Sequence, residues 1–456
     1  MTNTLRSTFG KGALLAAAAL TAIQIASFVP ASEAYAATPS IGVSVDGIVQ
    51  TGWKVKTIEK TEFVPVRLLA AAAGAKVEWD EAASTVTLTQ GTRIVKLTVK
   101  SKTAVVNGNQ TELKVAPVQQ GGTLWVPAAE AGRLLGAAVA EDLAASKLSI
   151  TPRLHPFASG DKQGFVNVFG ETVIPARYEE ANGFHEGLAI VKEDGKYGYI
   201  NALGEAVIPL QFDKAYDFSD GVALVEKDGV ASYINAAGKT ELSPTGYDEL
   251  YDFSEGLALV RKGDLFGYID HTGKEIVPAQ YEDAFYFSEG VAAVQVEGRY
   301  GYIDRTGATI IKPIYQGAFD FEGGFGLVQA EGENGEGSFG FVNAKGEEVI
   351  APTYAEAQAF SEGVAAVKAD DKHYFVNPKG ETVLSTEYED LGSFHEGLAA
   401  FAENGQYGYI DAKGKVVIPA QFDSAGEFNK GFAVVVSGAG SVLINVEGTI
   451  LAEATE

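Results

Sequence analysis

The sequence predicts a mainly β protein, in which a small α+β N-terminal domain precedes an all-β repeat array. The first observation is a glycine that recurs every 34 or 35 residues, with one longer spacing of 39. The second is that each of these glycines follows Phe-x-x and precedes an alternating apolar pattern. A fixed period of this length indicates a repeat architecture. The anchor glycines are Gly187, Gly221, Gly256, Gly290, Gly324, Gly363, Gly397 and Gly431.

Residues 1–36 have the pattern of a secretory signal peptide. Arg6 and Lys11 are positively charged, residues 13–29 are largely apolar, and Ala34-Tyr35-Ala36 is a small-x-small cleavage site. We expect cleavage after Ala36, with an uncleaved membrane anchor as the alternative. No other stretch has the roughly 18 consecutive apolar residues of a spanning helix. We therefore expect no membrane span after removal of the signal.

Residues 40–152 predict a compact α+β domain with an internal two-fold repeat. In each half a Val-Pro strand leads into an Ala-rich helical stretch, a glycine and further strands. Pro65 and Gly74 bound the helical stretch of the first half, and Pro127 and Gly136 bound that of the second. Proline at a helix start and glycine just past its end are typical boundaries. Between the halves, Asn107-Gly108 indicates a hairpin turn.

This region resembles the copper amine oxidase N-terminal-like domain, often called a stalk domain. The matching features are Val45-Asp46-Gly47, Phe63-Val64-Pro65-Val66-Arg67, the segment 74–80 and Val106-Asn107-Gly108. The resemblance implies an appendage without copper or catalysis, common on exported proteins of Gram-positive bacteria. An amine oxidase centre would need three histidine ligands, and residues 40–152 contain no histidine.

Residues 153–456 predict the repeat array, and one clean copy runs over residues 187–209. Residues 188–193 are expected to form a strand, followed by a hairpin turn at Asp194-Gly195. Residues 197–201 predict the next strand, and a turn at Gly204 leads to a third strand over 205–209. We expect Pro209 to end that strand, because proline cannot donate to a ladder.

The Gly-aromatic position recurs nine times in the array. The glycine is replaced in three copies by Ser232, Tyr374 and Val442, and the last copy has Leu443 at the aromatic position. The first copy has a poor opening strand and the last a poor closing strand. Atypical end copies are expected both in a capped solenoid and in a closed ring. We expect a β-propeller, with a β-solenoid or open superhelix as the alternative.

The array resembles the WG-repeat family, with tyrosine or phenylalanine at the place of the usual tryptophan. The pairs that carry the resemblance are Tyr197-Gly198, Phe266-Gly267, Tyr300-Gly301 and Tyr407-Gly408. It covers roughly the C-terminal two-thirds of the chain. The resemblance implies repeated all-β units with no known enzymatic role.

Composition excludes several classes of function. The chain has no cysteine, so disulfides, thiolate zinc sites, lipoprotein anchors and cysteine nucleophiles are excluded. An exported protein without disulfides favours a bacterial exterior. The formal net charge of −25 disfavours nucleic acid and anionic lipid as partners.

Candidate catalytic residues recur with the period. His185-Glu186 and His395-Glu396 begin like a zinc-protease motif but lack its second histidine. We expect the histidines, which are His155, His185, His271, His373 and His395, to lie in surface turns. Two sets of equivalent carboxylates are expected to be structural or solvated. One set is Glu186, Asp220, Glu255, Glu289, Glu362 and Glu396, and the other is Glu179, Asp213, Asp248, Glu282, Glu389 and Asp423.

We therefore expect a non-catalytic, exported bacterial protein, secreted or at the cell surface, whose repeats bind an envelope glycan or protein. The alternatives are a glycan-active enzyme with carboxylates on one face of the array, and a purely structural spacer. No catalytic, metal-binding or cofactor-binding residue is selected, and no cofactor is expected. A binding site is expected at departures from the period, which are Ser232, Tyr374, the end copies and the Gly/Glu-rich insertion 331–338, itself expected to be a flexible tip.

Overall fold

The computed structural model describes residues 41–142, 146–331, 337–438 and 440–455. Residues 39–456 form one compact unit, so the domain boundary expected between residues 152 and 153 stays a prediction. The expected signal peptide lies outside the described residues. In the part that the structure describes, no helix is long and apolar enough to cross a membrane.

The N-terminal region contains the two helices that the sequence predicts. The helices α1 (Val66–Ala72) and α2 (Ala128–Leu134) each begin directly after a proline, at Pro65 and Pro127. Gly74 and Gly136 follow them with positive φ, as helix ends require. The remaining elements are strands: β1 (Gly42–Val45), β2 (Ile48–Val49), β3 (Lys56–Ile58), β4 (Thr61–Pro65), β5 (Lys76–Asp80), β6 (Thr85–Gln90), β7 (Arg93–Thr98), β8 (Thr103–Val106), β9 (Asn109–Glu112), β10 (Val118–Gln120), β11 (Thr123–Pro127), β12 (Ala138–Asp142) and β13 (Lys147–Thr151).

The two halves of this region pair through equivalent strands. β4 and β11 run antiparallel, with Val64 opposite Val126, and each leads into its helix. They form one sheet in the order β10-β11-β4-β3, while β12-β13-β1-β2 and the meander β5 to β9 form two more. The helices and sheets enclose one apolar core that includes Leu69, Val126 and Leu135. The expected two-fold arrangement is therefore present.

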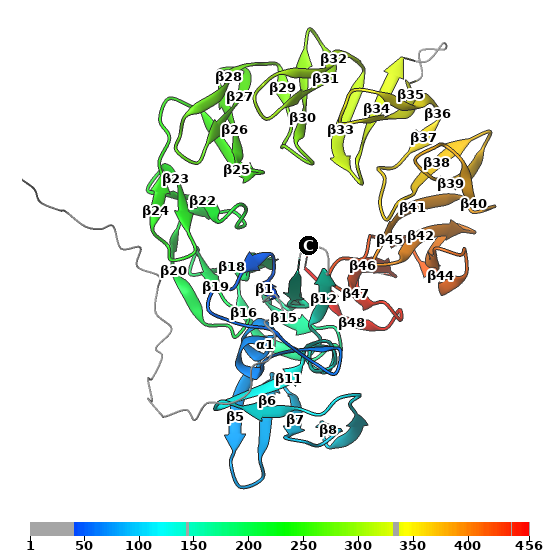
Figure 1. Ribbon diagram of the computed structural model, residues 1–456. Helices are drawn as coiled ribbons and strands as arrows, with labels where there is room; N and C mark the ends of the chain where they lie inside the picture. The colour runs from blue at the N-terminus through cyan, green and yellow to red at the C-terminus, as the bar shows by residue number, and fades with distance from the viewer. Residues whose placement is uncertain (1–40, 143–145, 332–336, 439, 456) are drawn as a thin grey trace, which may run out of the picture. The chain divides into compact units, whose positions relative to one another are not determined.

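The rest of the chain forms nine repeats of antiparallel strands in a closed ring (Figure 1). The first strand of a repeat lies nearest the centre of the ring and the fourth on the outside. We number the repeats 1 to 9 along the chain. First strands are β17 (Glu180–His185), β21 (Lys214–Ala215), β25 (Glu249–Ser254), β29 (Asp283–Ala284), β33 (Gly317–Glu322), β37 (Glu356–Ala357), β41 (Asp390–His395) and β45 (Ser424–Ala425), in repeats 2 to 9.

Second and third strands are present in all nine repeats. The second strands are β14 (Leu154–Ser159), β18 (Leu188–Glu193), β22 (Val222–Lys227), β26 (Leu257–Lys262), β30 (Val291–Val296), β34 (Phe325–Glu331), β38 (Ala365–Ala369), β42 (Leu398–Glu403) and β46 (Phe432–Ser437). The third strands are β15 (Lys162–Asn167), β19 (Lys196–Ile200), β23 (Val230–Asn235), β27 (Leu265–Asp270), β31 (Arg299–Asp304), β35 (Gly337–Asn343), β39 (Lys372–Val376), β43 (Gln406–Asp411) and β47 (Gly440–Asn445).

The fourth strands are β16 (Thr172–Tyr178), β20 (Ala206–Phe212), β24 (Thr240–Leu242), β28 (Glu275–Tyr281), β32 (Thr309–Tyr315), β36 (Glu348–Tyr354), β40 (Thr382–Ser385), β44 (Val416–Phe422) and β48 (Ile450–Ala454). The expectation that Pro209 ends its strand is wrong, because β20 continues to Phe212. The proline is tolerated on this outer edge strand, beside a register shift between Tyr197 and Tyr199.

Two further expectations about single repeats can be compared with the structure. The predicted poor opening strand of the first copy is wrong, because β14 spans six residues and repeat 1 lacks its first strand instead. The flexible tip expected at 331–338 falls mainly on residues 332–336, which lie outside the described residues. On either side of them, β34 and β35 stay paired as far as Glu331 and Gly337.

Neighbouring repeats are joined by aromatic pairs. In repeats 1 to 8, the aromatic residue of the third strand contacts the phenylalanine that precedes the next anchor turn, with ring centroids 4.6–5.1 Å apart. Tyr268, for example, packs edge-on against Phe287 and donates its hydroxyl to the carbonyl of Phe285. Such a pair contributes about 0.5–1.5 kcal/mol beyond its burial. Each of these pairs therefore joins the apolar cores of two neighbouring repeats.

Neighbouring repeats are also joined by a carboxylate on the anchor turn. The acidic residue and the anchor glycine both have positive φ, as at Glu186 and Gly187, which fits a type I′ hairpin turn. The carboxylate accepts the N–H of the anchor glycine one repeat further along. The pairs are Glu186 with Gly221, Asp220 with Gly256, Glu255 with Gly290, Glu289 with Gly324, Glu362 with Gly397 and Glu396 with Gly431.

The ring closes through the C-terminal strand. Ala454 pairs with Phe157 and Glu453 with Ala158, in the places that Ala181 and Glu180 take in repeat 2. The strand β48 thus supplies part of the first strand that repeat 1 lacks, and one seven-stranded sheet spans both ends of the array. Repeats 9 and 1 share an apolar cluster that includes Val166, Phe432 and Leu443. The propeller expectation is confirmed.

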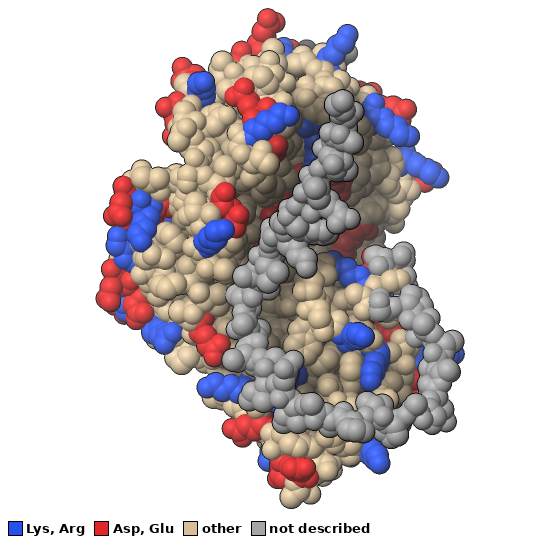
Figure 2. All heavy atoms as spheres, turned by 60° about the vertical axis from the view of Figure 1, so that its left-hand side comes forward, with Lys and Arg blue, Asp and Glu red and all other residues tan. Residues whose placement is uncertain are grey.

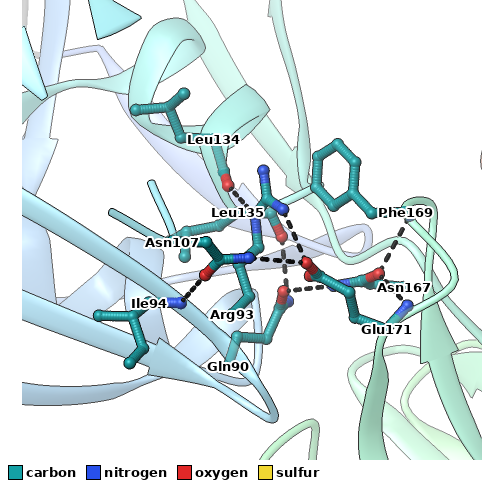
Figure 3. Close-up of polar contacts among 9 residues, drawn as sticks. All are labelled: Gln90, Arg93, Ile94, Asn107, Leu134, Leu135, Asn167, Phe169 and Glu171. Atoms are coloured by element: carbon teal, nitrogen blue, oxygen red, sulfur yellow. Dashed lines mark hydrogen bonds and ion pairs between the residues drawn. The ribbon is translucent and has the colours of Figure 1, made fainter. Parts of the chain in front are cut away.

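The N-terminal region is fastened to repeat 1 by buried polar side chains (Figure 3). Asn167 is fully buried and donates from Nδ2 to Gln90 Oε1 at 2.9 Å. Gln90, itself 1% exposed, donates to the carbonyls of Ala73 and Leu135. Buried amides with all partners supplied by protein hold a fixed geometry, because any shift would leave one unpaired.

A charged pair completes this junction. Arg93 Nη1 lies 3.1 Å from Glu171 Oε1, and its guanidinium stacks over the Phe169 ring at 3.7 Å. Asn107 also donates to Glu171, at 3.1 Å (Figure 3). Gly91 approaches the chain so closely that a Cβ there would lie 1.9 Å from the carbonyl oxygen of Thr172. The N-terminal region therefore packs directly against the ring, unlike the appendage that the resemblance implies.

Asp46 brings the N-terminal region into the ladder of anchor turns. Repeat 1 has Pro152 and Arg153 where later repeats have an acid and a glycine. Asp46, in an Asp-Gly hairpin turn between β1 and β2, accepts the N–H of Gly187 at 3.0 Å in place of the missing acid. Lys430, at the acid position of repeat 9, donates to Asp46 Oδ1 at 3.0 Å and to the carbonyl of Phe184 at 2.6 Å. Asp46 thus bridges repeats 2 and 9 across the seam.

Removal of β48 by ending the chain after Thr449 should destabilise the whole ring. The loss of Leu451 and Ala454 from the closing cluster and of the β14 pairing should cost about 2–4 kcal/mol. Hydrogen exchange followed by mass spectrometry would show faster exchange in repeats 4 and 5 as well as at the seam. Faster exchange confined to repeats 1, 8 and 9 would instead describe an open array whose end frays.

Asp46→Ala should lower the free energy of unfolding by about 1–3 kcal/mol, because it leaves Lys430 and the Gly187 N–H without their carboxylate. Urea denaturation would measure the change. Asp161→Ala, at an exposed turn of repeat 1, is the matched control and should change stability by less than about 0.5 kcal/mol. Equal stability of the two variants would remove Asp46 from the seam.

Candidate binding site

The twelve repeated carboxylates are occupied by backbone groups. The first set forms the ladder described above. The second set accepts N–H groups of the turn between the second and third strands of the same repeat: Glu179 from Gly195, Asp213 from Asp228, Asp248 from Gly263, Glu282 from Gly298, Glu389 from Gly405 and Asp423 from Gly438. Every carboxylate of both sets therefore has a structural role, as the sequence predicted.

The histidines do not all lie in surface turns. His373 is 6% exposed, with Nδ1 3.1 Å from the carbonyl of Tyr388. His155 lies within β14, with its ring 5.2 Å from that of Phe432, so the surface-turn expectation is wrong for both. His271 stacks on Phe253 at 4.0 Å. His185 and His395 each face a carboxylate, at 3.6 and 3.0 Å. Among the described residues, no group of three or more histidine and acidic side chains is placed to hold a metal ion.

The residue before the Gly-aromatic pair varies from repeat to repeat. From repeat 1 to repeat 9 it is Gln163, Tyr197, Ala231, Phe266, Tyr300, Phe339, His373, Tyr407 and Ser441. Where it is aromatic, its ring packs on the boundary between repeats and is half-buried. Tyr197 and Tyr300 also donate their hydroxyls to carboxylates of the first strand at 2.7 Å. This aromatic side chain therefore fills the space between one repeat and its neighbour.

Repeat 3 lacks this ring, and a pocket of about 380 Å³ lies there between repeats 3 and 4. Ala231 replaces the aromatic residue, and Leu224, Val225 and Leu250 also line the pocket. Repeat 3 is also the repeat in which Ser232 replaces the glycine, one of the departures from the period at which a binding site was expected. The replacement of an aromatic residue by Ala231 was the signal that sequence reasoning missed.

Three tyrosines and one aspartate give the pocket its chemistry. Tyr216, Tyr251 and Tyr286 line it together with Asp252, and Tyr216 and Tyr286 are 43% and 37% exposed. Tyr286 stands at the position that Asp217, Asp252 and Asp320 occupy in other repeats. The pocket therefore combines aromatic rings and a carboxyl group in a set that the period does not reproduce elsewhere.

Asp252 is chemically unusual. Its Oδ1 is buried without a hydrogen-bond partner. Burial, and secondarily the nearby Asp217 carboxylate, raise the pKa of Asp252 to about 6. The pKa of Asp217 is also raised by burial, and its Oδ1 is likewise unpartnered. An unpartnered buried acceptor costs free energy until a donor reaches it, so Asp252 is a place where a ligand hydroxyl would be favoured.

Two ion pairs lie at the rim of the pocket, whose lining also includes the acidic Asp248 and Asp252. Lys214 Nζ lies 2.9 Å from Glu226 Oε2, and Arg261 pairs with Glu249. Figure 2 shows the same intermixing of acidic and basic side chains over the repeats on the face that it turns forward. The acidic excess is therefore dispersed, and the pocket offers hydrogen bonds and aromatic surface more than a field of one sign.

Two other departures leave space, but of different character. At the seam, where Gln163 and Ser441 stand at the aromatic position, a cavity of about 730 Å³ is lined by small and polar residues. In repeat 7, His373 largely fills the equivalent place and leaves about 20 Å³. Neither of these two cavities is lined by an aromatic ring other than that of His373. The pocket beside Ala231 is thus the strongest candidate for a binding site.

Comparisons with protein families agree with both resemblances that the sequence predicted. A model described as the copper amine oxidase N-terminal domain matches residues 51–150. A model described as the WG containing repeat matches eight segments that together cover more than half of the chain. They are residues 164–197, 197–230, 232–266, 266–300, 300–333, 339–372, 375–407 and 407–438.

No curated protein matches the chain. Among solved structures, a eukaryotic initiation factor is similar at 12% identity with a TM-score of 0.47, over 65% of this chain and 94% of that one. Hsv2 from Kluyveromyces lactis is similar at 9% identity with a TM-score of 0.31, over 50% and 92%. The extracellular domain of a one-component system from B. thetaiotaomicron is similar at 10% identity with a TM-score of 0.29, over 91% and 77%.

Asp252→Asn should stabilise the protein at neutral pH. Because the folded-state pKa is raised from 3.8 to about 6, the folded state binds more protons than the unfolded state between about pH 4 and 6. The free energy of unfolding of the wild type therefore falls as the pH rises through this window. The variant should be about 1–2 kcal/mol more stable at pH 7.5, after solvent screening is allowed for.

Urea denaturation at pH 4, 5, 6 and 7.5 would measure this difference, which should shrink towards pH 4. The exposed Asp264→Asn, in the same repeat, is the control and should show no such trend. A stability difference between Asp252→Asn and wild type that does not change with pH would contradict the raised pKa.

Proposed function

The chain belongs to the family of WG-repeat proteins, with a copper amine oxidase N-terminal domain ahead of the repeats, and we propose that it is a non-catalytic, exported bacterial protein that binds a partner through its ring. The partner we propose is a component of the cell envelope, either a glycan or a protein. The observation that carries the proposal is the pocket at Ala231, where the loss of the repeated aromatic side chain leaves a space lined by three tyrosines and Asp252.

The non-catalytic part of the proposal is supported by where the carboxylates go. Both repeated sets accept backbone N–H groups, so their oxygens are engaged in holding turns. A carboxylate that holds a turn is poorly placed to exchange a proton with a substrate. The export part is supported by the signal-like residues 1–36 and by the absence of cysteine. The acidic surface supports a partner other than nucleic acid.

One observation favours a second candidate, a glycan-active enzyme. Asp252 has a pKa near 6, raised by burial and secondarily by the Asp217 carboxylate, and a carboxyl group with a raised pKa beside a second one is the pairing that glycoside hydrolysis uses. Asp252 lines the pocket and Asp217 does not, and each of the two carboxyl groups has a buried oxygen without a hydrogen-bond partner. We place this candidate second because only one of the two carboxyl groups belongs to the pocket lining.

The purified protein should be retained on bacterial cell walls from Gram-positive species in a sedimentation assay. Retention should survive moderate salt, because the proposed contact relies on aromatic surface and hydrogen bonds. An acidic globular protein of similar charge is the control for non-specific adsorption. Absence of retention on walls, wall glycans and wall proteins would contradict the envelope proposal. Release of new reducing ends from the walls, lost in Asp252→Asn, would establish the enzyme instead.

A further inference from the structure

We propose that the pocket between repeats 3 and 4 holds one sugar residue of a glycan, seated where the other repeats seat their own aromatic ring. This inference deepens the proposed envelope-binding function and rests on it for the source of the glycan. It names the ligand class, a neutral sugar, and the residues that contact it. The arguments are the shape of the vacated space, its aromatic walls, its unpartnered acceptor and the pairing of its rim charges.

The pocket lies at the position that an aromatic side chain occupies in repeat 2. In repeat 2, Tyr197 packs between Lys192, Phe212 and the next repeat. In repeat 3 the equivalent residue is Ala231, and the floor below it is formed by Leu224 and Val225, which are 5% and 1% exposed. The resulting pocket of about 380 Å³ is in the range of small-ligand sites. A flat six-membered ring therefore fits the place that a tyrosine fills elsewhere.

The side chains that line the pocket match both the apolar faces and the polar edge of a sugar ring. A pyranose ring presents C–H groups on its faces and hydroxyl groups around its edge. Tyr216, Tyr251 and Tyr286 offer apolar ring faces for the C–H groups and phenol hydroxyls for the edge. The hydroxyl of Tyr251 is already held by Glu249, which fixes that ring in place. A pre-positioned aromatic wall lowers the entropy that binding must overcome.

Asp252 supplies the directional contact. Asp252 lines the pocket and is half-buried, and rotation of its side chain would bring the unpartnered Oδ1 within reach of a sugar hydroxyl. Satisfying a buried acceptor of this kind stabilises a complex, whereas a ligand without a donor would leave the cost in place.

The rim favours a neutral ligand over an anionic one. Lys214 and Arg261 are engaged by Glu226 and Glu249, and the remaining charged residues of the lining, Asp248 and Asp252, are acidic, so no cation is left to attract an anion. An aromatic side chain from a protein partner is the rival occupant, since it would also replace the missing ring. It brings at most one donor, whereas a sugar residue brings several hydroxyl groups to Asp252, Tyr216 and Tyr286. The polar walls therefore favour the sugar.

The full chain should be titrated with chemically defined probes by calorimetry and by NMR of its tyrosine rings. The probes are trisaccharides of glucose with α or β linkages, a trisaccharide of N-acetylglucosamine, and N-acetyltyrosinamide as a mimic of an aromatic side chain. We expect at least one trisaccharide to bind and to shift the signals of Tyr216 and Tyr286. Binding of N-acetyltyrosinamide with no sugar binding would overturn the proposal in favour of the rival.

The decisive variant is Ala231→Tyr, which gives repeat 3 the residue that repeat 2 has at Tyr197. It should fill the pocket, keep or raise thermal stability, and weaken sugar binding at least tenfold. Ala231→Ser leaves the space open and should change the affinity less than about twofold. Tyr286→Phe tests the hydroxyl contact and should weaken binding several-fold. Undiminished sugar binding by Ala231→Tyr would overturn the proposed site.

Cell-wall sedimentation of the same variants separates this inference from the proposed function. If wild type and Ala231→Tyr are retained equally, envelope binding stands and the pocket assignment is overturned. If neither is retained while trisaccharides still bind in the pocket, the sugar site stands and the envelope proposal fails. Retention of wild type that Ala231→Tyr loses supports both.

Discussion

The ring depends on contacts that each repeat makes with the next one. A third-strand aromatic ring packs on the phenylalanine of the following repeat, and a carboxylate accepts the N–H of the following anchor glycine. Neither contact is possible within a single repeat. A lone repeat would expose one apolar face and an unpaired turn, so the units are stable only as a chain of neighbours. This constraint makes the two ends of the chain the critical places in the molecule.

At each end of the repeat array, another segment of the chain supplies the strand or the carboxylate that the end repeat lacks. The strand β48 carries Glu453 and Ala454 into the register that Glu180 and Ala181 have in repeat 2. The N-terminal region places Asp46, on an Asp-Gly turn of its own, against Gly187 and Lys430. The N-terminal region therefore joins the two ends of the ring at the seam. The buried contacts of Asn167, Gln90 and Arg93 hold it in position. A module that resembles an appendage by sequence is here a component of the ring's closure.

The same constraint explains why the candidate site lies between repeats 3 and 4. A ring of equivalent contacts has no special point until a side chain that fills a boundary is lost. At Ala231 the boundary loses its aromatic ring, and neighbouring tyrosines and Asp252 become the walls of a pocket. At Ser441 the same loss gives a cavity without tyrosines. The candidate site thus depends both on the loss of the aromatic side chain at Ala231 and on the tyrosines and Asp252 that surround the space it leaves.

The sequence by itself determined the period, the strand-and-turn pattern within a repeat and the two helices of the N-terminal region, because these depend on short-range chemistry. Turn glycines, helix boundaries and alternating apolar residues act within a few positions of one another. The sequence also marked repeat 3 through Ser232. Only the tertiary structure decided that the array closes, that Pro209 lies within an edge strand, that His373 is buried, and that Asp46 reaches residues 141 and 384 positions away. It also decided which vacancy carries tyrosines, because Tyr216, Ala231, Asp252 and Tyr286 come from three repeats whose side chains meet only when the ring is formed.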